Sequence, residues 1–67
     1  GFDGYGRIDM MFEDRIVISD SSKKLSSSVV YGTPSSSNAS KSAFRVGNTV
    51  AYLLDQNREI VSLWLIK

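Results

Sequence analysis

The chain contains no cysteine and no histidine among its 67 residues. Without cysteine there is no disulfide, no thiolate nucleophile and no thiolate metal ligand. Without histidine the chain lacks the usual general base at neutral pH and the commonest metal ligand. A serine nucleophile also needs an activating base, and only lysine is left for that role. These absences predict that the chain is not an enzyme and holds no cofactor and no metal.

Long hydrophobic runs and an excess of charge of one sign are also missing. The longest uninterrupted apolar run covers residues 50–54, far short of the roughly 20 residues that span a bilayer. Eight lysine and arginine residues are balanced by seven aspartate and glutamate residues, which leaves a net charge of +1. Such a balance argues against duplex DNA or an anionic membrane as a partner. We therefore expect no membrane span and disfavour nucleic acid.

The chain is short enough to form one small domain, which we place over residues 1–67. A domain of this size buries only about 60% of the surface of its unfolded chain, so its core is small. Without a disulfide, a free-standing protein of this size is unusual. We therefore expect a piece excised from a longer, multi-domain protein.

Serine is the most unevenly distributed residue type. Of the twelve serines, eleven lie between Ser19 and Ser42. Serine side chains hydrogen-bond to nearby backbone and favour turns and loops. The range 32–43 is therefore predicted to be an exposed, serine-rich loop, which leaves two apolar flanks to build the core.

The N-terminal flank alternates between apolar and polar residues. Ile8, Met10 and Phe12 share one side of an extended chain, which predicts a half-buried strand. The β-branched cluster at 15–19 predicts a second strand, joined to the first by a tight turn. Two short strands are expected further on, at 23–25 and 28–31.

The C-terminal flank consists of two apolar runs, 49–54 and 59–66, joined by a short polar segment. This arrangement predicts a hairpin, with Asn57 in a left-handed conformation at its turn. Apolar residues of both parities in the last run indicate burial on both sides of that strand. A helix over 59–66 is the rival interpretation, and the β-branched content argues against it.

These elements predict an all-β fold: a small single-domain barrel or sandwich of about five mostly antiparallel strands, of SH3-like or OB-like size, with a C-terminal hairpin. Trp64 is expected on the outer side of the last strand. The predicted core is Ile8, Met10, Phe12, Ile16, Ile18, Val30, Phe44, Val46, Val50, Tyr52, Leu54, Val61, Leu63 and Leu65.

Few residues suggest a binding site. The acidic residues fall mainly at predicted turns, where solvation explains them. Small β-barrels often bind single strands with basic and aromatic side chains. A candidate binding surface is therefore formed by Tyr5, Arg7, Tyr31, Arg45 and Arg58.

Residues 44–61, with the sequence FRVGNTVAYLLDQNREIV, resemble a small all-β module of bacterial S-layer and S-layer-homology-associated surface proteins. That module has the pattern aromatic-x-V-G-D-x-V-x-L-L-L-D-x-x-G-x-V-V. Asn48 stands where aspartate is usual, and Asn57 where glycine is usual. The resemblance implies a spacer or assembly module of an extracytoplasmic protein, and it carries no catalytic or ligand-binding residues.

Three functions remain open on these grounds. The first is a non-catalytic structural or interaction module of a bacterial cell-surface protein, with neighbouring domains or other surface proteins as partners. The second is a small barrel that binds single-stranded nucleic acid or an oligosaccharide. The third is an accessory domain of a larger wall-active enzyme. We expect an extracellular or cell-envelope location, and the cytoplasm remains an alternative.

Overall fold

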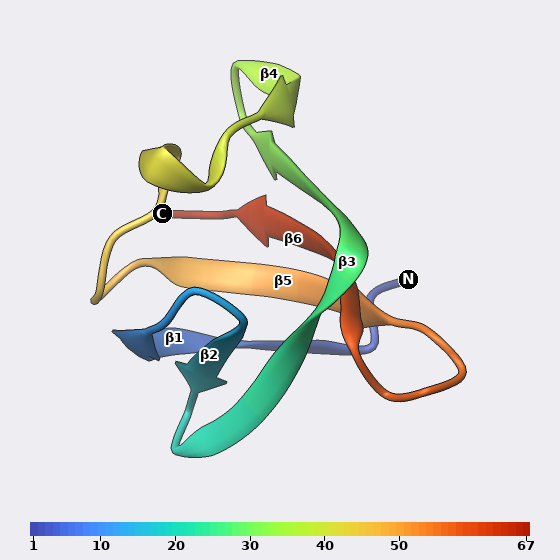
Figure 1. Ribbon diagram of the computed structural model, residues 1–67. Helices are drawn as coiled ribbons and strands as arrows, with labels where there is room; N and C mark the ends of the chain where they lie inside the picture. Colours follow the sequence, from blue (N-terminus) through green and yellow to red (C-terminus); the bar gives the residue numbers. More distant parts are fainter.

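Six strands and one short 3₁₀ helix form the fold, and the computed structural model describes residues 1–67 throughout (Figure 1). The elements are β1 (Gly4–Met11), β2 (Arg15–Ile18), β3 (Ser21–Thr33), β4 (Ser36–Ala39), η1 (Lys41–Ala43), β5 (Thr49–Leu54) and β6 (Ile60–Leu65). The predicted all-β class is therefore confirmed, and the last run is a strand rather than a helix.

Five of the strands close into a barrel. The sheet order is β2-β1-β5-β6-β3-β4, and a further pairing between β2 and β3 closes the first five of these strands into a ring, with β4 outside it. The pairs are antiparallel except β3 with β6, which run parallel. A five-stranded barrel closed in this order has the connectivity of the OB fold. The predicted C-terminal hairpin is present as the antiparallel pair β5–β6.

Strand β3 is the longest element and serves both halves of the barrel. Its first residues pair with β2, from Ser21 to Lys24. The register with β6 then begins at Leu25 and is irregular before Val30. The sequence predicts two short strands here, at 23–25 and 28–31. In the structure a single strand continues through the intervening serines, where the Ser28 amide donates to Ser26 Oγ over 3.1 Å.

The range 32–43, expected to be an exposed loop, contains β4 and η1. Strand β4 folds back on β3, with Ala39 opposite Tyr31 and Ser36 opposite Thr33. Most of its side chains are exposed, but its backbone is paired. A polar sequence therefore supplies a sixth strand outside the barrel, because the ladder needs only backbone groups.

The interior is filled by eight buried residues: Ile8, Ile16, Ile18, Leu25, Phe44, Val50, Ile60 and Leu63. Six of these were predicted; Leu25 and Ile60 were not. Tyr52, Leu54 and Leu65 pack against this cluster and are partly buried. Four predicted core residues are wrong, because Met10, Phe12, Val30 and Val46 are 44–61% exposed. Val61 is partly exposed and does not belong to the cluster, because it lies where the register of β6 on β5 shifts.

A β-bulge explains the error in the first strand. The register of β1 on β2 shifts between Ile8 and Met10, so that Met11 rather than Met10 lies opposite Ile16. One extra residue reverses the side of the sheet to which each later side chain points. Met11 accordingly packs against the core and Met10 is exposed. Phe12 lies beyond the end of β1 and Val46 lies in the segment before β5.

The β5–β6 turn differs from the prediction by one residue. The left-handed residue is Arg58, with φ of 63°, and not Asn57. The Arg58 amide donates to the Asp55 carbonyl over 3.0 Å, and Asp55 Oδ1 accepts the amides of Asn57 and Glu59. The aspartate therefore organises the turn from its first position. None of the helical structure in the chain is long and apolar enough to cross a membrane.

Candidate functional site: a pocket beside strand β3

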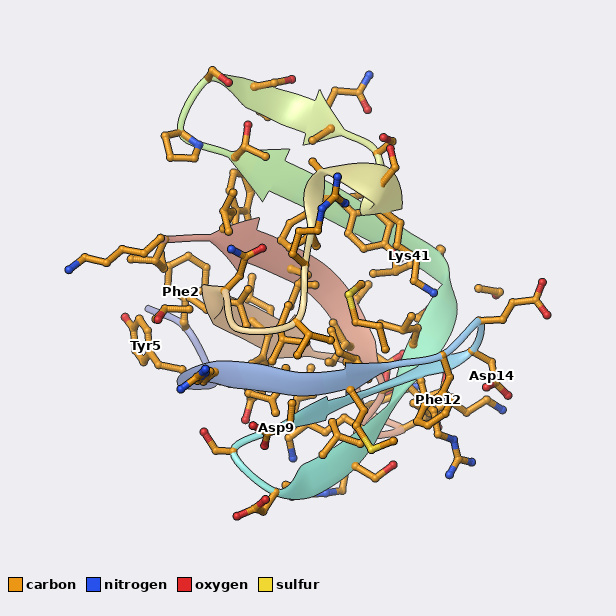
Figure 2. All side chains as sticks on the ribbon, turned by 90° about the vertical axis from the view of Figure 1, so that its left-hand side faces the viewer. Phe2, Tyr5, Asp9, Phe12, Asp14 and Lys41 are labelled. Carbon is orange, nitrogen blue, oxygen red and sulfur yellow. The ribbon has the colours of Figure 1, made fainter.

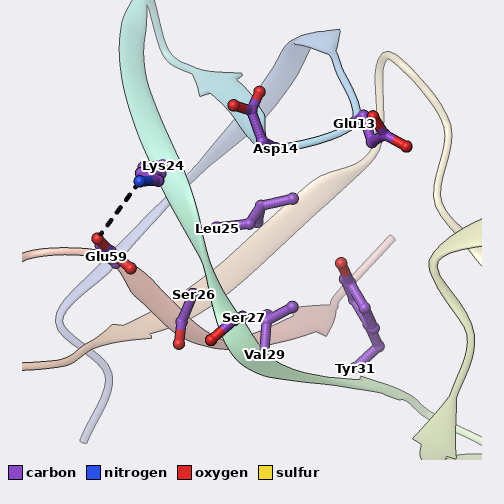
Figure 3. Close-up of a pocket in the computed structure, with 9 residues that line it drawn as sticks. All are labelled: Glu13, Asp14, Lys24, Leu25, Ser26, Ser27, Val29, Tyr31 and Glu59. Carbon is purple, nitrogen blue, oxygen red and sulfur yellow. Dashed lines mark ion pairs between the residues drawn. The ribbon is translucent and has the colours of Figure 1, made fainter.

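A pocket of about 380 Å³ opens on the side of the barrel beside β3 (Figure 3). It is bounded by the β1–β2 turn, by β3 and by the end of the β5–β6 turn. The lining residues are Glu13, Asp14, Lys24, Leu25, Ser26, Ser27, Val29, Tyr31 and Glu59. Its volume lies at the small end of the range of ligand pockets in proteins.

The β1–β2 turn carries Glu13 and Asp14 and is held in place by two other elements. The Leu25 amide of β3 donates to the Asp14 carbonyl over 2.8 Å. From η1, Lys41 Nζ donates to the carbonyls of Phe12 and Glu13, the latter over 3.0 Å. The backbone that carries both carboxylates is therefore anchored, although the carboxylates themselves extend into solvent.

The apolar wall of the pocket comes from β3. Leu25, Val29 and Tyr31 extend towards the side on which the β1–β2 turn lies (Figure 3). The Tyr31 ring packs against Phe44, with ring centroids 5.6 Å apart. Burial raises the pKa of the Tyr31 hydroxyl above its ordinary value of 10.0, so this group is a neutral hydrogen-bonding group at physiological pH.

The charged part of the lining is mainly acidic. Lys24 Nζ lies 4.0 Å from a carboxylate oxygen of Glu59, so the lysine has an acidic partner within the pocket. Glu13 and Asp14 add two more carboxylates on the opposite side. The lining thus holds three carboxylates and one ammonium, and Arg15 lies 4.0 Å from Asp14 just outside it. The pocket therefore offers carboxylate acceptors to hydroxyl or amine donors and no basic groove for phosphates.

The residues predicted as a binding surface do not come together on one side of the barrel. Tyr5 and Arg7 are neighbours on the outer side of β1, where their partners on β5 are Ala51 and Thr49. Tyr31 lies on β3 and faces the pocket instead.

The remaining two arginines lie in different connecting segments. Arg45 precedes β5, and its guanidinium donates to the Ser42 carbonyl over 2.9 Å. Arg58 belongs to the β5–β6 turn. Of the predicted residues, Tyr31 alone lines the pocket.

From the sequence alone, the carboxylates of the pocket are expected to be solvated turn residues. Their one sequence signal is position: Glu13–Asp14 and Glu59 both lie in or beside turns between predicted strands. Which turns are neighbours depends on the parallel β3–β6 pairing, which periodicity does not specify. The residues of the site can therefore be found in the sequence, but the sequence does not predict that they lie close together.

The pocket combines an apolar wall, hydroxyl groups and carboxylates, which suits reversible binding of a polar ligand. No group of three or more acidic side chains is arranged to hold a metal ion. The fold and site thus define the chain as an OB-type barrel with an acidic lateral pocket. No family model matches the chain, and no curated protein or solved structure is significantly similar to it.

Proposed function

We propose that this chain is a non-catalytic interaction module of a bacterial cell-surface protein of the S-layer type. Its pocket binds an uncharged, hydroxyl-rich ligand, of which a segment of cell-wall glycan is the natural example. The observation that carries this proposal is the pocket itself, because it places hydrogen-bonding groups around an aromatic and aliphatic wall. The cell-surface part is supported by the resemblance of residues 44–61 to S-layer-associated modules.

The position of the pocket in the barrel also supports a binding role. OB-type barrels bind oligonucleotides and oligosaccharides with their second and third strands and the two loops beside them. Here the lining comes from β3, the β1–β2 turn and the end of the β5–β6 turn, which are the corresponding elements. This is an analogy between folds, so the choice of ligand depends on the chemistry of the residues.

Charge distinguishes the two ligand classes that such barrels bind. A single-stranded nucleic acid needs a basic groove along its phosphates, whereas Glu13, Asp14 and Glu59 outnumber Lys24 in the lining. A glycan without charged groups offers hydroxyls to the carboxylates and a C–H face to the Tyr31 ring. The pocket therefore favours the oligosaccharide over the nucleic acid.

The proposal is tested by NMR titration of the ¹⁵N-labelled chain with N-acetylglucosamine oligomers. We expect saturable shifts in the amides of Leu25, Val29 and Tyr31 and in those of the β1–β2 turn. An oligothymidylate of similar length serves as the contrasting ligand at the same ionic strength, and we expect it to leave these amides unchanged.

Two variants make the test specific to the pocket. Tyr31→Phe removes the hydroxyl and keeps the ring that packs against Phe44, so the fold is retained while the affinity falls about threefold to tenfold. Ser37→Ala on β4 lies outside the pocket and is expected to bind as the parent does. Shifts on adding oligothymidylate, or the absence of shifts with every glycan tested, would contradict the proposal.

A further inference from the structure

A second surface, on the other side of the same strands, is apolar and carries no charge. Outward-facing positions of β1, β5, β6 and β3 form a continuous row, because Tyr5 pairs with Ala51, Ala51 with Trp64 and Trp64 with Gly32. The next row contains Leu53, Ser62 and Val30. We call this surface the aromatic face and define it by the residues Phe2, Tyr5, Val30, Leu53 and Trp64.

The small residues of these rows form the floor of the aromatic face. Ala51 is fully buried and Ser62 is only 7% exposed, although both point outwards. Phe2 lies beside both partners of Ala51, because its ring centroid is 5.7 Å from that of Tyr5 and 6.5 Å from that of Trp64. Ser62 is contacted by the Trp64 indole, whose Nε1–H donates to its Oγ. Figure 2 shows Phe2 and Tyr5 together at one edge of the molecule, far from Phe12 and Asp14.

Both ends of this aromatic row are held rigidly. The Trp64 indole lies against Gly32, where a Cβ atom would overlap the ring, and its Nε1–H donates to Ser62 Oγ. Phe2 is positioned by its neighbour Asp3, whose amide donates to the Tyr52 carbonyl over 2.9 Å. A rigid aromatic surface loses little conformational entropy when it becomes covered.

Exposed apolar area remains on this rigid surface. Tyr5 is 65% exposed, Val30 54% and Phe2 38%. An uncharged apolar centre rich in tyrosine, tryptophan and phenylalanine, with charged residues at its margin, is the usual composition of the centre of a protein–protein interface. Arg7 borders Tyr5, but the residues of the aromatic face themselves include no lysine or arginine, so this face lacks the basic groove that a nucleic acid needs.

The charges at the margin are self-complementary. Asp3, which directly precedes β1, and Arg7 of β1 lie two residues before and two residues after Tyr5, about 13 Å apart for an extended chain. Asp3 Oδ2 accepts the Leu54 amide over 2.6 Å, which holds the carboxylate at this margin. A two-fold axis through Tyr5 therefore brings Asp3 of one copy opposite Arg7 of the other, twice. Such reciprocal contacts define an isologous interface.

We propose that the aromatic face binds a second copy of this chain, in a symmetric dimer with Tyr5 near its two-fold axis. A standard interface buries about 800 Å² on each partner. The molecule measures 29 × 24 × 21 Å, so even its broadest side is no larger than this. The free chains therefore associate weakly, with a dissociation constant of about 0.1–1 mM.

The experiment is a dilution series of the ¹⁵N-labelled chain from about 2 mM to 0.02 mM, followed by amide shifts and by translational diffusion. We expect the shifts to change at Tyr5, Ala51, Leu53 and Trp64 and not at the pocket. Tyr5→Lys places two ammonium groups against each other at the axis, so the dissociation constant rises at least tenfold. Arg7→Asp opposes Asp3 of the other copy and raises it about fivefold.

The matched control is Phe12→Ser, which removes an exposed aromatic residue far from the aromatic face (Figure 2). We expect its dissociation constant to stay within twofold of the parent value. Unchanged amide dispersion establishes that each variant is folded. A chain that remains monomeric at 2 mM overturns the proposal, as does association that survives Tyr5→Lys.

One further outcome assigns the aromatic face to another partner. Shifts at Tyr5 and Trp64 on adding N-acetylglucosamine oligomers, without any change on dilution, would make this face a glycan site and overturn self-association. The pocket titration is carried out at 0.02 mM, below the expected dissociation constant, where most chains are monomeric. The failure of either proposal therefore leaves the other unaffected.

Discussion

The two surfaces of the barrel, the aromatic face and the pocket, are built from neighbouring residues of the same strand. Val30 and Gly32 of β3 point outwards to the aromatic face, whereas Val29 and Tyr31 point to the core and the pocket. Because successive side chains of a strand point to opposite sides of the sheet, consecutive residues of β3 belong to two different surfaces. The aromatic face is uncharged and is partly covered by the Phe2 ring. The pocket carries charged side chains and is open to solvent. Variants at these positions test whether the two are independent.

The largest effect is expected at Gly32, which supports the aromatic face. A Cβ atom at this position overlaps the Trp64 ring, so Gly32→Ala forces the indole away from the strand and from Ser62. We expect a loss of about 2–3 kcal/mol in the free energy of unfolding, measured by urea denaturation. Because Trp64 is the single tryptophan, its fluorescence emission shifts to the red in the folded variant.

The control for this variant is the same substitution at another glycine. Nothing lies within 4 Å of a Cβ atom at Gly1, so Gly1→Ala is expected to change stability by less than about 0.5 kcal/mol. The pocket amides of Gly32→Ala should keep their glycan-induced shifts if the two surfaces are independent. Loss of those shifts would show that the aromatic face and the pocket are coupled.

A smaller effect is expected from the bulge in β1, which decides which methionine points inwards. Met11 packs against the core, so Met11→Ala costs about 1–2 kcal/mol, less than a fully buried methionine would. Met10 is 51% exposed, and Met10→Ala costs less than about 0.5 kcal/mol. Denaturant midpoints of the two variants give the comparison. Equal losses would mean that the bulge is absent in solution.

The sequence predicts the strands of this fold better than their register. Alternation identifies β1, the β-branched cluster identifies β2, and the two apolar runs identify β5 and β6. The bulge near Asp9 leaves no trace in the apolar pattern, since Met10 and Met11 are equally apolar. The exposure of Met10 therefore depends on how β1 pairs with β2. The one extra residue at the bulge turns Met10 to the outer side, whereas the sequence predicts it on the inner side.

The pocket was harder to predict than the core for a related reason. Its residues are common surface types, and Glu13 and Glu59 are far apart in the sequence. They come to line one pocket because β3 pairs in parallel with β6 after a long crossover and in antiparallel with β2. The aromatic face was partly foreseeable, because Trp64 was expected on the outer side of its strand. Its cover, Phe2, has no periodicity that could indicate it.

The partly buried Tyr31 predicts a loss of stability at alkaline pH. Its pKa is raised in the folded chain by burial, so between pH 10 and that higher value the unfolded chain releases a proton that the folded chain retains. Stability is therefore unaffected by this group below about pH 10 and falls as the pH rises above it. Tyr31→Phe removes this contribution, which is measured by urea denaturation at pH 8 and pH 11. An equal alkaline loss in both proteins would contradict the assignment.

The smallest effect is expected from the ion pair at the pocket, and this completes the contrast with the aromatic face. Lys24 is 61% exposed and lies 4.0 Å from Glu59, so solvent screens the pair and Lys24→Gln costs less than about 0.5 kcal/mol. Arg15→Gln, which removes the similar exposed pair with Asp14, is the matched control and should cost as little. If both losses are this small, the pocket charges contribute little to folding and are free to bind a ligand, whereas the rings of the aromatic face stabilise the barrel. A loss above about 1 kcal/mol for Lys24→Gln alone would instead make its pair with Glu59 part of what closes β3 onto β6.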